Sequence, residues 1–231
     1  MFINTFKYSP RDVDCKLCTE YARKNACTAE RCLWLSERIE ADVVGYEEVL
    51  LESFPKKSPF RWRLRLLVDL FSGTLWNNEK HSRRMEAQKA INGYSRRRDT
   101  PEYYAALYLQ TSDSDVYGRS NKAFSSTGID FPKIRMRNVS THAYTVIAAA
   151  RSIYTGSGQV TDVDLANPEI VGIDAFRLIV HALLIVRYGL NVLNITTKKR
   201  CNLPQKNGGA WLWLFFVWTR TGTIPSCPTT I

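Results

Sequence analysis

The sequence predicts an all-α fold, or nearly so, made of a small cysteine-rich N-terminal module, a multi-helix globular domain and a poorly ordered tail. Two observations predict the helices: apolar residues recur at helical spacing in most segments, and these segments have recognisable caps at their ends. A third is that strand signals are few, since only 129–137 has the pattern of a short strand. With 231 residues, of which 45% are apolar, the chain is long enough to bury a core.

The best local signal is a cluster of cysteines near the start of the chain. Cys15, Cys18, Cys27 and Cys32 follow the spacing C-x2-C-x8-C-x4-C. Four thiolates this close together are typical of a tetrahedral zinc site, and a C-x2-C pair can point both sulfurs at one ion. Thr28 is a good helix N-cap, which places Cys32 in the first turn of a helix. We therefore predict a structural zinc ion in a module that spans residues 1–54.

Four protein ligands leave no open coordination position, so a catalytic metal is not expected at these cysteines. Because the module is too small for a core of its own, zinc binding would supply its folding free energy, about 10–16 kcal/mol in small zinc modules. The cysteine spacing leaves two alternatives to zinc open. One is an iron–sulfur cluster, and the other is a set of reduced thiols that hold no metal.

A helical domain with a basic face is expected over residues 55–196. The proline-containing break at 54–59 marks its boundary with the N-terminal module. Ser58 as N-cap and Pro59 at the first helical position begin a helix that runs to about residue 71. The apolar stripe of this helix consists of Phe60, Leu64, Leu67 and Phe71. Further helices are expected over 33–43, 43–54 and 78–92, from Thr100 onward, and over 114–126, 140–154 and 174–188.

The helix over 174–188 is apolar on nearly all sides, which predicts the central buried helix of the domain. His181 lies within it and is expected to be a hydrogen-bonded core histidine rather than a metal ligand. His81 and His142 are isolated, and the sequence has no nucleophile elbow, phosphate-binding loop or dinucleotide-binding glycine pattern. These observations predict that the protein is not an enzyme.

Positive charge is concentrated in the middle of the chain. The formal net charge is +10, but residues 1–54 carry −3, residues 55–98 carry +9 and residues 99–231 carry +4. If the two helices of the central segment pack antiparallel, their cations share one outer face that can follow phosphates. The aromatic residues available there to stack on bases are Trp62, Trp76 and Tyr94. The cations assigned to this face are Lys56, Lys57, Arg61, Arg63, Arg65, Arg83, Arg84, Arg96, Arg97 and Arg98.

This basic face has two interpretations of equal weight. In the first it binds nucleic acid, with DNA preferred over RNA. In the second it is a solvated surface whose arginines also pair with acids of the N-terminal module. A steep loss of affinity with rising salt distinguishes phosphate contact from the second interpretation.

The end of the chain differs from the rest. Residues 197–231 are expected to lie outside the packed domain, as a disordered or non-native tail, because Asp174 is the last acidic residue. The apolar run 210–218 is about half the length of a membrane span, so stable membrane insertion is not expected, although its tryptophans suit an interfacial anchor or a docking segment. The start of the chain lacks the apolar region of a secretory signal, which predicts a cytoplasmic protein.

Several segments together resemble an uncharacterised family of proteins carried on conjugative transposons and related mobile elements of gut bacteria. The resemblance spans about residues 10–195, and it implies a bacterial cytoplasm and an accessory role on mobile DNA but no established activity. The segments that carry it are Cys15–Tyr21 (CKLCTEY), Cys27–Cys32 (CTAERC), Val44–Glu48 (VGYEE), Gly73–Trp76 (GTLW), Thr100–Ala106 (TPEYYAA) and Ala182–Gly189 (ALLIVRYG).

The sequence therefore predicts a zinc-stabilised, non-enzymatic accessory protein of a mobile element that binds nucleic acid through a basic helical face. The alternative is a protein-interaction factor, an adaptor or inhibitor that acts on a protein of a host, conjugative-transfer or defence complex. A third hypothesis is an enzyme that acts on nucleic acid with carboxylates from separate helices.

Overall fold

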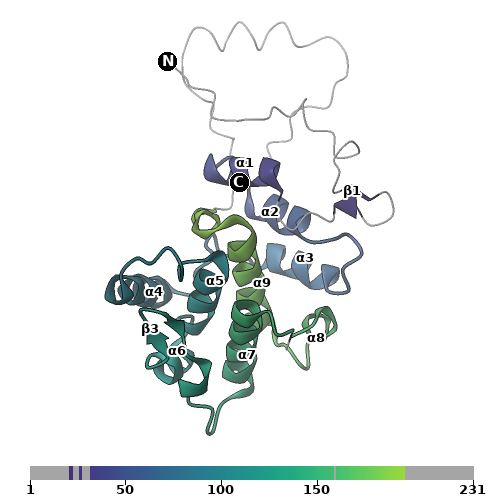
Figure 1. Cartoon of the computed structure of the whole chain (residues 1–231). Helices are drawn as coiled ribbons and strands as arrows, with labels where there is room; N and C mark the ends of the chain where they lie inside the picture. The colour runs from purple at the N-terminus through teal and green to yellow at the C-terminus, as the bar shows by residue number, and fades with distance from the viewer. Residues whose placement is uncertain (1–20, 23–25, 28–31, 159, 196–231) are drawn as a thin grey trace, which may run out of the picture. The chain divides into compact units, whose positions relative to one another are not determined.

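The computed structural model describes residues 21–22, 26–27, 32–158 and 160–195 (Figure 1). All described residues belong to one compact unit. These residues are mostly helical, and their strands are limited to two short hairpins. The predicted all-α, or nearly all-α, fold is thus confirmed. The expectation for the tail 197–231 lies outside the described residues.

The first described elements are a hairpin and three helices. Strand β1 (Tyr21–Ala22) pairs antiparallel with β2 (Ala26–Cys27). The helices are α1 (Leu33–Glu40), α2 (Tyr46–Ser53) and α3 (Arg61–Asp69). Although α1 and α2 fall in the segment assigned above to the N-terminal module, their buried side chains join the same hydrophobic core as the residues after 54. These side chains include Leu35, Ile39, Val49 and Leu50.

Local capping chemistry sets the ends of the longer helices. Helix α4 (Glu79–Asn92) begins after Asn78, whose side chain accepts a hydrogen bond from the backbone N–H of His81. In the same way Thr100 caps α5 (Pro101–Gln110), and Ser140 caps α7 (Thr141–Thr155). The left-handed residue Gly156 ends α7. These helix starts confirm the predictions made from the sequence.

The segment after α5 departs from the prediction. The expected helix over 114–126 stops early, as α6 (Ser114–Ser120), because the next residues form the hairpin of β3 (Phe124–Ser125) and β4 (Gly128–Ile129). The expected strand over 129–137 is likewise cut short. Pro132 has no N–H to donate to a ladder, and the chain turns there into the 3₁₀ helix η1 (Phe131–Lys133).

Gly128 is required where this hairpin meets α7. Its φ of +148° is a backbone conformation that side-chain-bearing residues rarely adopt. A Cβ atom at this position would also clash with the hydroxyl group of Tyr154, which lies directly against it. The hairpin therefore approaches α7 closely at this one glycine.

The core lies between α5, α7 and α9 (Ile173–Tyr188), which pack against one another (Figure 1). Alanines on all three helices are fully buried and allow the backbones to approach closely. Helix α9 is buried along most of its length, as predicted, and η2 (Leu190–Asn194) packs back on it and on α1. The short helix α8 (Asp162–Ala166), which the sequence analysis missed, precedes α9. None of the described helices combines the length and the apolar character needed to span a membrane.

Candidate nucleic-acid interface

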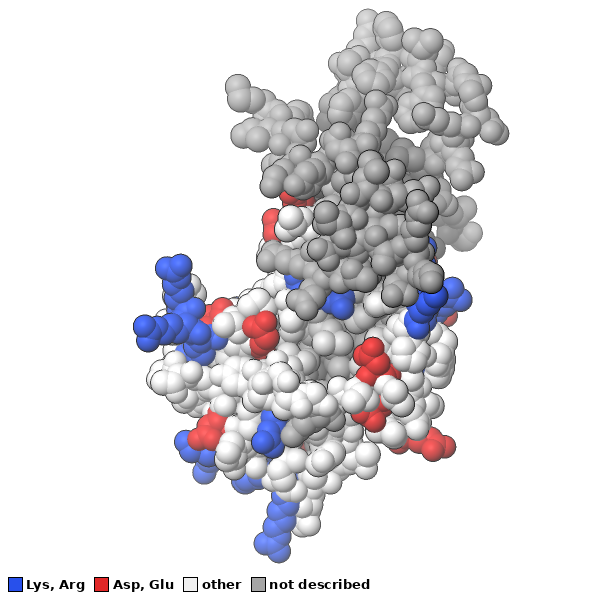
Figure 2. All heavy atoms as spheres, turned by 45° about the vertical axis from the view of Figure 1, so that its right-hand side comes forward, with Lys and Arg blue, Asp and Glu red and all other residues white. Residues whose placement is uncertain are grey.

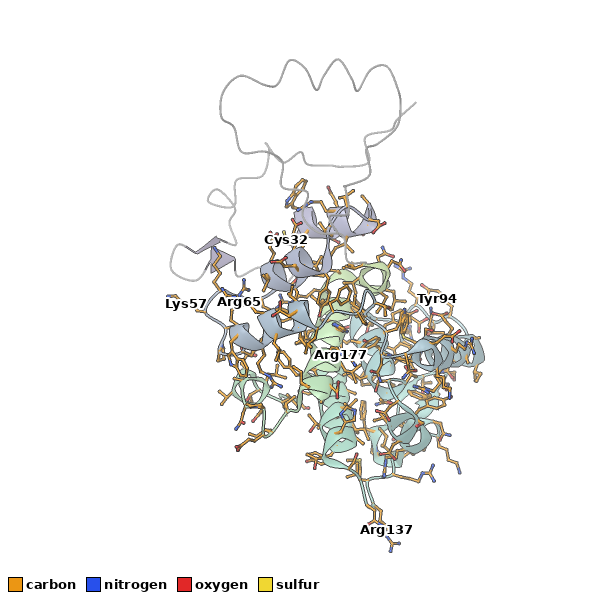
Figure 3. The ribbon with its side chains drawn as sticks, turned by 180° about the vertical axis from the view of Figure 1, so that it is seen from behind. Cys32, Lys57, Arg65, Tyr94, Arg137 and Arg177 are labelled. Atoms are coloured by element: carbon orange, nitrogen blue, oxygen red, sulfur yellow. The ribbon has the colours of Figure 1, made fainter. Side chains whose placement is uncertain are left out.

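The ten cations assigned to one basic face lie in two separate groups. Helix α3 packs on α2, whereas α4 packs on α5, and α5 and α9 lie between α3 and α4 (Figure 1). From behind, Lys57 and Arg65 lie on one side of the domain and Tyr94 lies on the other (Figure 3). The antiparallel pairing of the two central helices, on which the single face depended, is therefore not the arrangement in the structure.

Arg63 is part of the core rather than the surface. Its side chain is 1% exposed, and its two terminal nitrogens each donate a hydrogen bond of 2.6 Å, to the backbone oxygens of Leu165 and Val171. The guanidinium also lies 4.1 Å from the ring centroid of Phe176. Burial lowers the pKa of Arg63. Because it is enclosed, this guanidinium cannot reach a phosphate without unfolding its surroundings.

Two further predicted cations are half-buried and bind backbone carbonyl groups. Arg61 donates hydrogen bonds to the backbone oxygens of Leu51 and Phe54, at 2.6 and 3.0 Å. Arg84 donates to those of Thr111 and Ser112, at 2.7 and 3.0 Å. In each case burial is the main reason that the pKa of the arginine is lowered. Both side chains therefore join neighbouring segments, and part of the donor capacity of each guanidinium is already in use.

Arg98 organises the loop between α4 and α5. It pairs with Asp99 at 2.6 Å, and both side chains are almost fully buried. Its other nitrogens donate to the backbone oxygens of Asn92, Gly93 and Ser126. The second carboxylate oxygen of Asp99 accepts a hydrogen bond of 3.1 Å from the backbone N–H of Ser95. Loop 93–99 is therefore held from inside by a buried ion pair and by four further hydrogen bonds of these two side chains.

The same loop exposes an aromatic ring and, two and three residues later, two cations. Tyr94 is 82% exposed, and Arg96 and Arg97 beside it are exposed as well. An aromatic face can stack on an unpaired base, and a neighbouring guanidinium can bind the phosphate next to it. Loop 93–99 is therefore a preformed platform of one ring and two cations, which we call the Tyr94 loop.

The cations on the outer face of α4 are largely compensated by acids of the same helix. Arg83 forms an ion pair with Glu79, and Lys89 forms one with Glu86 at 3.0 Å. Exposed pairs of this kind contribute little stability, about 0.3–0.5 kcal/mol each. They do reduce the positive potential of the helix, so Arg83 adds less to the interface than the two arginines of the Tyr94 loop.

The α3 side carries a smaller exposed group. Lys56, Lys57 and Arg65 are exposed, and Trp62 is 52% exposed on the same helix as Arg65. Trp76, the third aromatic residue proposed for stacking, is instead half-buried and packs against the rings of His81 and Tyr108. Of the three aromatic residues, Trp62 and Tyr94 are therefore accessible to a base.

A third group of cations, which the sequence analysis missed, lies on the loop before α7. Lys133, Arg135 and Arg137 are exposed there, and Arg137 projects from the domain (Figure 3). Arg119 holds this loop by donating to the backbone oxygens of residues 135, 137 and 138. The face in Figure 2 shows separate groups of Lys and Arg with Asp and Glu between them. The alternation of cations in KIRMR is the sequence signal that marks this loop.

The predicted zinc ligands are only partly described. Cys15 and Cys18 lie outside the described residues, and Cys27 ends strand β2. Cys32 is half-buried at the N-cap of α1, one residue before the helix rather than in its first turn. Among the described side chains, no three His, Cys, Asp or Glu residues lie together as a metal site requires.

The buried histidines are structural. His81 accepts a hydrogen bond at Nδ1 from the backbone N–H of Asn77, and its Nε2 lies 2.8 Å from the backbone oxygen of Tyr108. His181 is 1% exposed and contacts Tyr46 and Tyr108, which confirms it as a hydrogen-bonded core histidine. Neither ring is available to a ligand from solvent.

Comparison with known proteins assigns neither a family nor a function. No protein-family model, curated protein or solved structure matches this chain.

Proposed function

We propose that this chain is a non-enzymatic nucleic-acid-binding protein that contacts its target through the Tyr94 loop. The observation that carries the proposal is an 82% exposed tyrosine beside two exposed arginines, on a loop fixed from inside by Arg98 and Asp99. Because the loop is already ordered, binding costs little additional conformational entropy. The role of the central basic segment is thereby narrowed from an extended helical face to one short loop.

The chemistry of this loop favours single-stranded nucleic acid. A tyrosine ring can stack only on a base that is not already stacked between its neighbours, and base–aromatic stacking contributes about 1–3 kcal/mol per base. Arg96 and Arg97 follow Tyr94 closely in the sequence and would bind phosphates next to the stacked base. The sequence-based preference for DNA over RNA remains part of the proposal.

The remaining parts of the proposal rest on the sequence. Zinc bound by Cys15, Cys18, Cys27 and Cys32 would stabilise the N-terminal segment. The resemblance to proteins of conjugative transposons supports an accessory role on mobile DNA in a bacterial cytoplasm.

Titration of the full chain with a fluorescent oligo-dT of about 20 nucleotides, at 50 and 200 mM salt, tests the proposal. Two phosphate contacts on a single strand predict that affinity falls about sevenfold over this range. The double variant Arg96→Ala/Arg97→Ala should bind weakly and lose most of that salt dependence. Tyr94→Ala should lose roughly 5- to 150-fold in affinity, whereas Tyr94→Phe should bind like the wild type because it keeps the ring.

The matched control is Lys56→Ala/Lys57→Ala, which removes the same charge from the opposite side of the domain. It should change affinity little. If this control weakens binding as much as the arginine variant does, the positive charge acts non-specifically and the Tyr94 loop is not the interface. Binding that is absent, or insensitive to salt, contradicts the proposal and favours the protein-interaction alternative.

A further inference from the structure

The turn between β3 and β4 lies directly beside the Tyr94 loop. One terminal nitrogen of Arg98, Nη1, donates to the backbone oxygen of Asn92 at 3.1 Å and to that of Ser126 at 3.2 Å. Asn92 is the last residue of α4, and the Tyr94 loop begins at the next residue. Because one nitrogen binds both oxygens, the start of the loop and the turn of the hairpin are held side by side.

Contacts with α4 fix one side of this hairpin. Strand β3 packs on α4, as Figure 1 shows. The ring of Phe124 in β3 stacks on that of Tyr117, with the two centroids 6.4 Å apart. The hydroxyl group of Tyr117 in turn donates a hydrogen bond of 3.3 Å to the side chain of Gln88 on α4. The hairpin therefore follows the last turns of α4 toward the Tyr94 loop.

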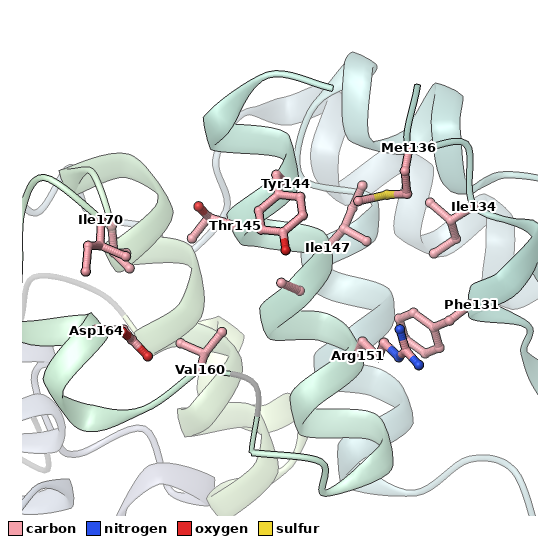
Figure 4. A pocket seen from close by; sticks show the side chains of 12 residues that line it. Phe131, Ile134, Met136, Tyr144, Thr145, Ile147, Arg151, Val160, Asp164 and Ile170 are labelled. Atoms are coloured by element: carbon pink, nitrogen blue, oxygen red, sulfur yellow. The ribbon is translucent and has the colours of Figure 1, made fainter. Parts of the chain in front are cut away.

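Contacts with α7 fix the other side. Gly128 of β4 lies against the hydroxyl group of Tyr154, and the ring of Phe131, just after the hairpin, lies 5.7 Å from that of Tyr154. Figure 4 shows Phe131 beside Arg151 of α7, at one end of an apolar groove along that helix. The turn is thus preformed, and a ligand that contacts it does not have to order it.

The turn displays hydroxyl groups. Ser126 and Thr127 at its tip are both exposed. The hydroxyl group of Ser125 donates to the backbone oxygen of Gly128 at 3.0 Å and lies 3.0 Å from the hydroxyl group of Thr127, so it helps to orient that group. Residues 121–129 include no aspartate or glutamate. The turn therefore presents neutral hydrogen-bonding groups without a carboxylate among them.

The acidic residues near the Tyr94 loop are largely engaged. Asp99 is buried against Arg98, and Glu86 on α4 pairs with Lys89 at 3.0 Å. Glu102 is exposed in the first turn of α5, where a negative charge favours the helix N-terminus. Because the Tyr94 loop carries two exposed arginines, the surface next to the turn still favours an anion.

Serine and threonine hydroxyl groups are common partners of phosphate oxygens in protein–nucleic acid complexes. Resting on the function proposed above, we propose that the β3–β4 turn is a second contact of the same site with single-stranded nucleic acid. With one base stacked on Tyr94, a phosphate further along the strand accepts hydrogen bonds from the hydroxyl groups of Ser126 and Thr127. Arg98 holds the loop and the turn in the arrangement that lets one strand reach both.

Neutral contacts of this kind have a distinct signature. Salt dependence counts the phosphates that cations neutralise, whereas a hydroxyl group adds affinity without releasing a counterion. The double variant Ser126→Ala/Thr127→Val removes both hydroxyl groups and keeps the shape of the side chains. It should lower affinity about three- to tenfold at each salt concentration. The roughly sevenfold effect of salt should remain, in contrast to its loss in Arg96→Ala/Arg97→Ala.

The test uses the full chain with the oligo-dT and the two salt concentrations given above. Ser72→Ala, which removes an exposed hydroxyl group from the loop after α3, is the control and should bind like the wild type. A parallel titration with oligo-rU separates the two polar parts of the backbone. Because DNA and RNA share the phosphate, the turn variant should lose the same factor on both. Circular dichroism and thermal unfolding check that each variant keeps its fold.

Each other outcome overturns a stated part. Unchanged affinity in the turn variant, together with a loss in Tyr94→Ala, would overturn the second contact and leave the proposed function in place. A wild-type chain that binds neither oligonucleotide would remove both. A loss confined to oligo-rU would assign the turn to the ribose 2′-hydroxyl instead of phosphate, and a loss that also abolishes the salt dependence would show that the substitutions act on the arginines of the Tyr94 loop. An equal loss in Ser72→Ala would show that the effect is not specific to the turn.

Discussion

The hydroxyl group of Tyr46 lies 2.9 Å from Nε2 of His181, in a fully buried contact between α2 and α9. On the other side of the ring, Nδ1 lies 3.1 Å from the backbone oxygen of Leu75, which can only accept a hydrogen bond. All these groups form hydrogen bonds when Nδ1 carries the proton. Nδ1–H then donates a hydrogen bond to the backbone oxygen of Leu75, and Nε2 accepts one from the hydroxyl group of Tyr46. His181 is therefore neutral in the folded protein and links residues from three parts of the chain.

The two buried histidines make stability depend on pH. Burial lowers the pKa of His81 to about 4 and that of His181 to about 3, so both are neutral when folded and bind protons near pH 6.5 when unfolded. Their contribution to stability is complete above pH 6.5 and is lost as the pH falls below it. From pH 7 to pH 5 we expect the free energy of unfolding to fall by about 2 kcal/mol for each histidine.

Urea unfolding at the two pH values measures this loss. In the His181→Gln variant the pH-dependent part should fall to about half. His142 is the control: its hydrogen bond to Asp113 raises its pKa, so its smaller contribution has the opposite sign, and His142→Gln should leave the loss in place. Stability that is the same at pH 7 and pH 5 would contradict the neutral buried pair.

Arg63 and Arg65 should differ sharply in their effect on stability. Replacing the buried Arg63 with alanine leaves a cavity and two carbonyl groups, of Leu165 and Val171, without their donors. We expect Arg63→Ala to lower the free energy of unfolding by about 3–5 kcal/mol. Arg65→Ala, two residues away on the same helix but exposed, should change it by no more than about 0.5 kcal/mol. Equal effects in denaturant titrations would mean that Arg63 does not hold α8.

Gln110 offers a route to a more stable protein. It is fully buried at the end of α5, and neither atom of its amide has a hydrogen-bond partner among the described residues. Gln110→Met keeps the shape and removes the unpaired polar atoms, so it should raise the free energy of unfolding by about 1–2 kcal/mol. Gln88→Met is the control, because Gln88 is also buried but accepts a hydrogen bond from Tyr117, and it should be destabilising. A loss of stability in Gln110→Met would show that its amide is satisfied.

Metal analysis tests the cysteine cluster. Purified full chain should contain about one zinc ion, and removing it with a chelator should expose residues of about 10–32 to hydrogen exchange, while α1 stays protected because Leu35 and Ile39 belong to the core. Cys15→Ser should abolish zinc binding, whereas Cys201→Ser, outside the cluster, should not. Iron together with inorganic sulfide would indicate the iron–sulfur alternative, and zinc bound equally by both variants would place the ion elsewhere.

The sequence predicts several helix starts well because capping is local, although the predicted start at Ser58 and Pro59 was wrong: α3 begins at Arg61, after Phe60. Asn78, Thr100 and Ser140 each lie beside the backbone N–H groups that they accept from, so no distant contact is needed to recognise them. Prediction from the sequence fails where contacts with distant residues determine the local secondary structure. The hairpin after α6 forms against α4 and α7, and α8 has only five residues and is fixed by the distant Arg63.

The candidate interface was harder to predict for the same reason. Arg63, Arg65 and Arg98 look alike in a charge count, yet one is in the core, one is exposed and one braces a loop. Periodicity did contain a signal for Arg63, which follows Phe60 by three residues and so lies on the apolar stripe of its helix. No comparable signal marks Arg98, because apart from the neighbouring Asp99 its partners are backbone carbonyl groups, which every residue has.

The way that Arg98 and Arg119 hold their loops has a consequence for how such a protein can diversify. Arg119 binds the loop before α7 only through backbone oxygens, and apart from Asp99 the acceptors of Arg98 are backbone oxygens as well. The shape of each loop thus depends little on the side chains it displays. Residues 94, 96, 97 and 137 can be exchanged, by natural drift or in a randomised library, to alter what is recognised while the loops keep their conformation.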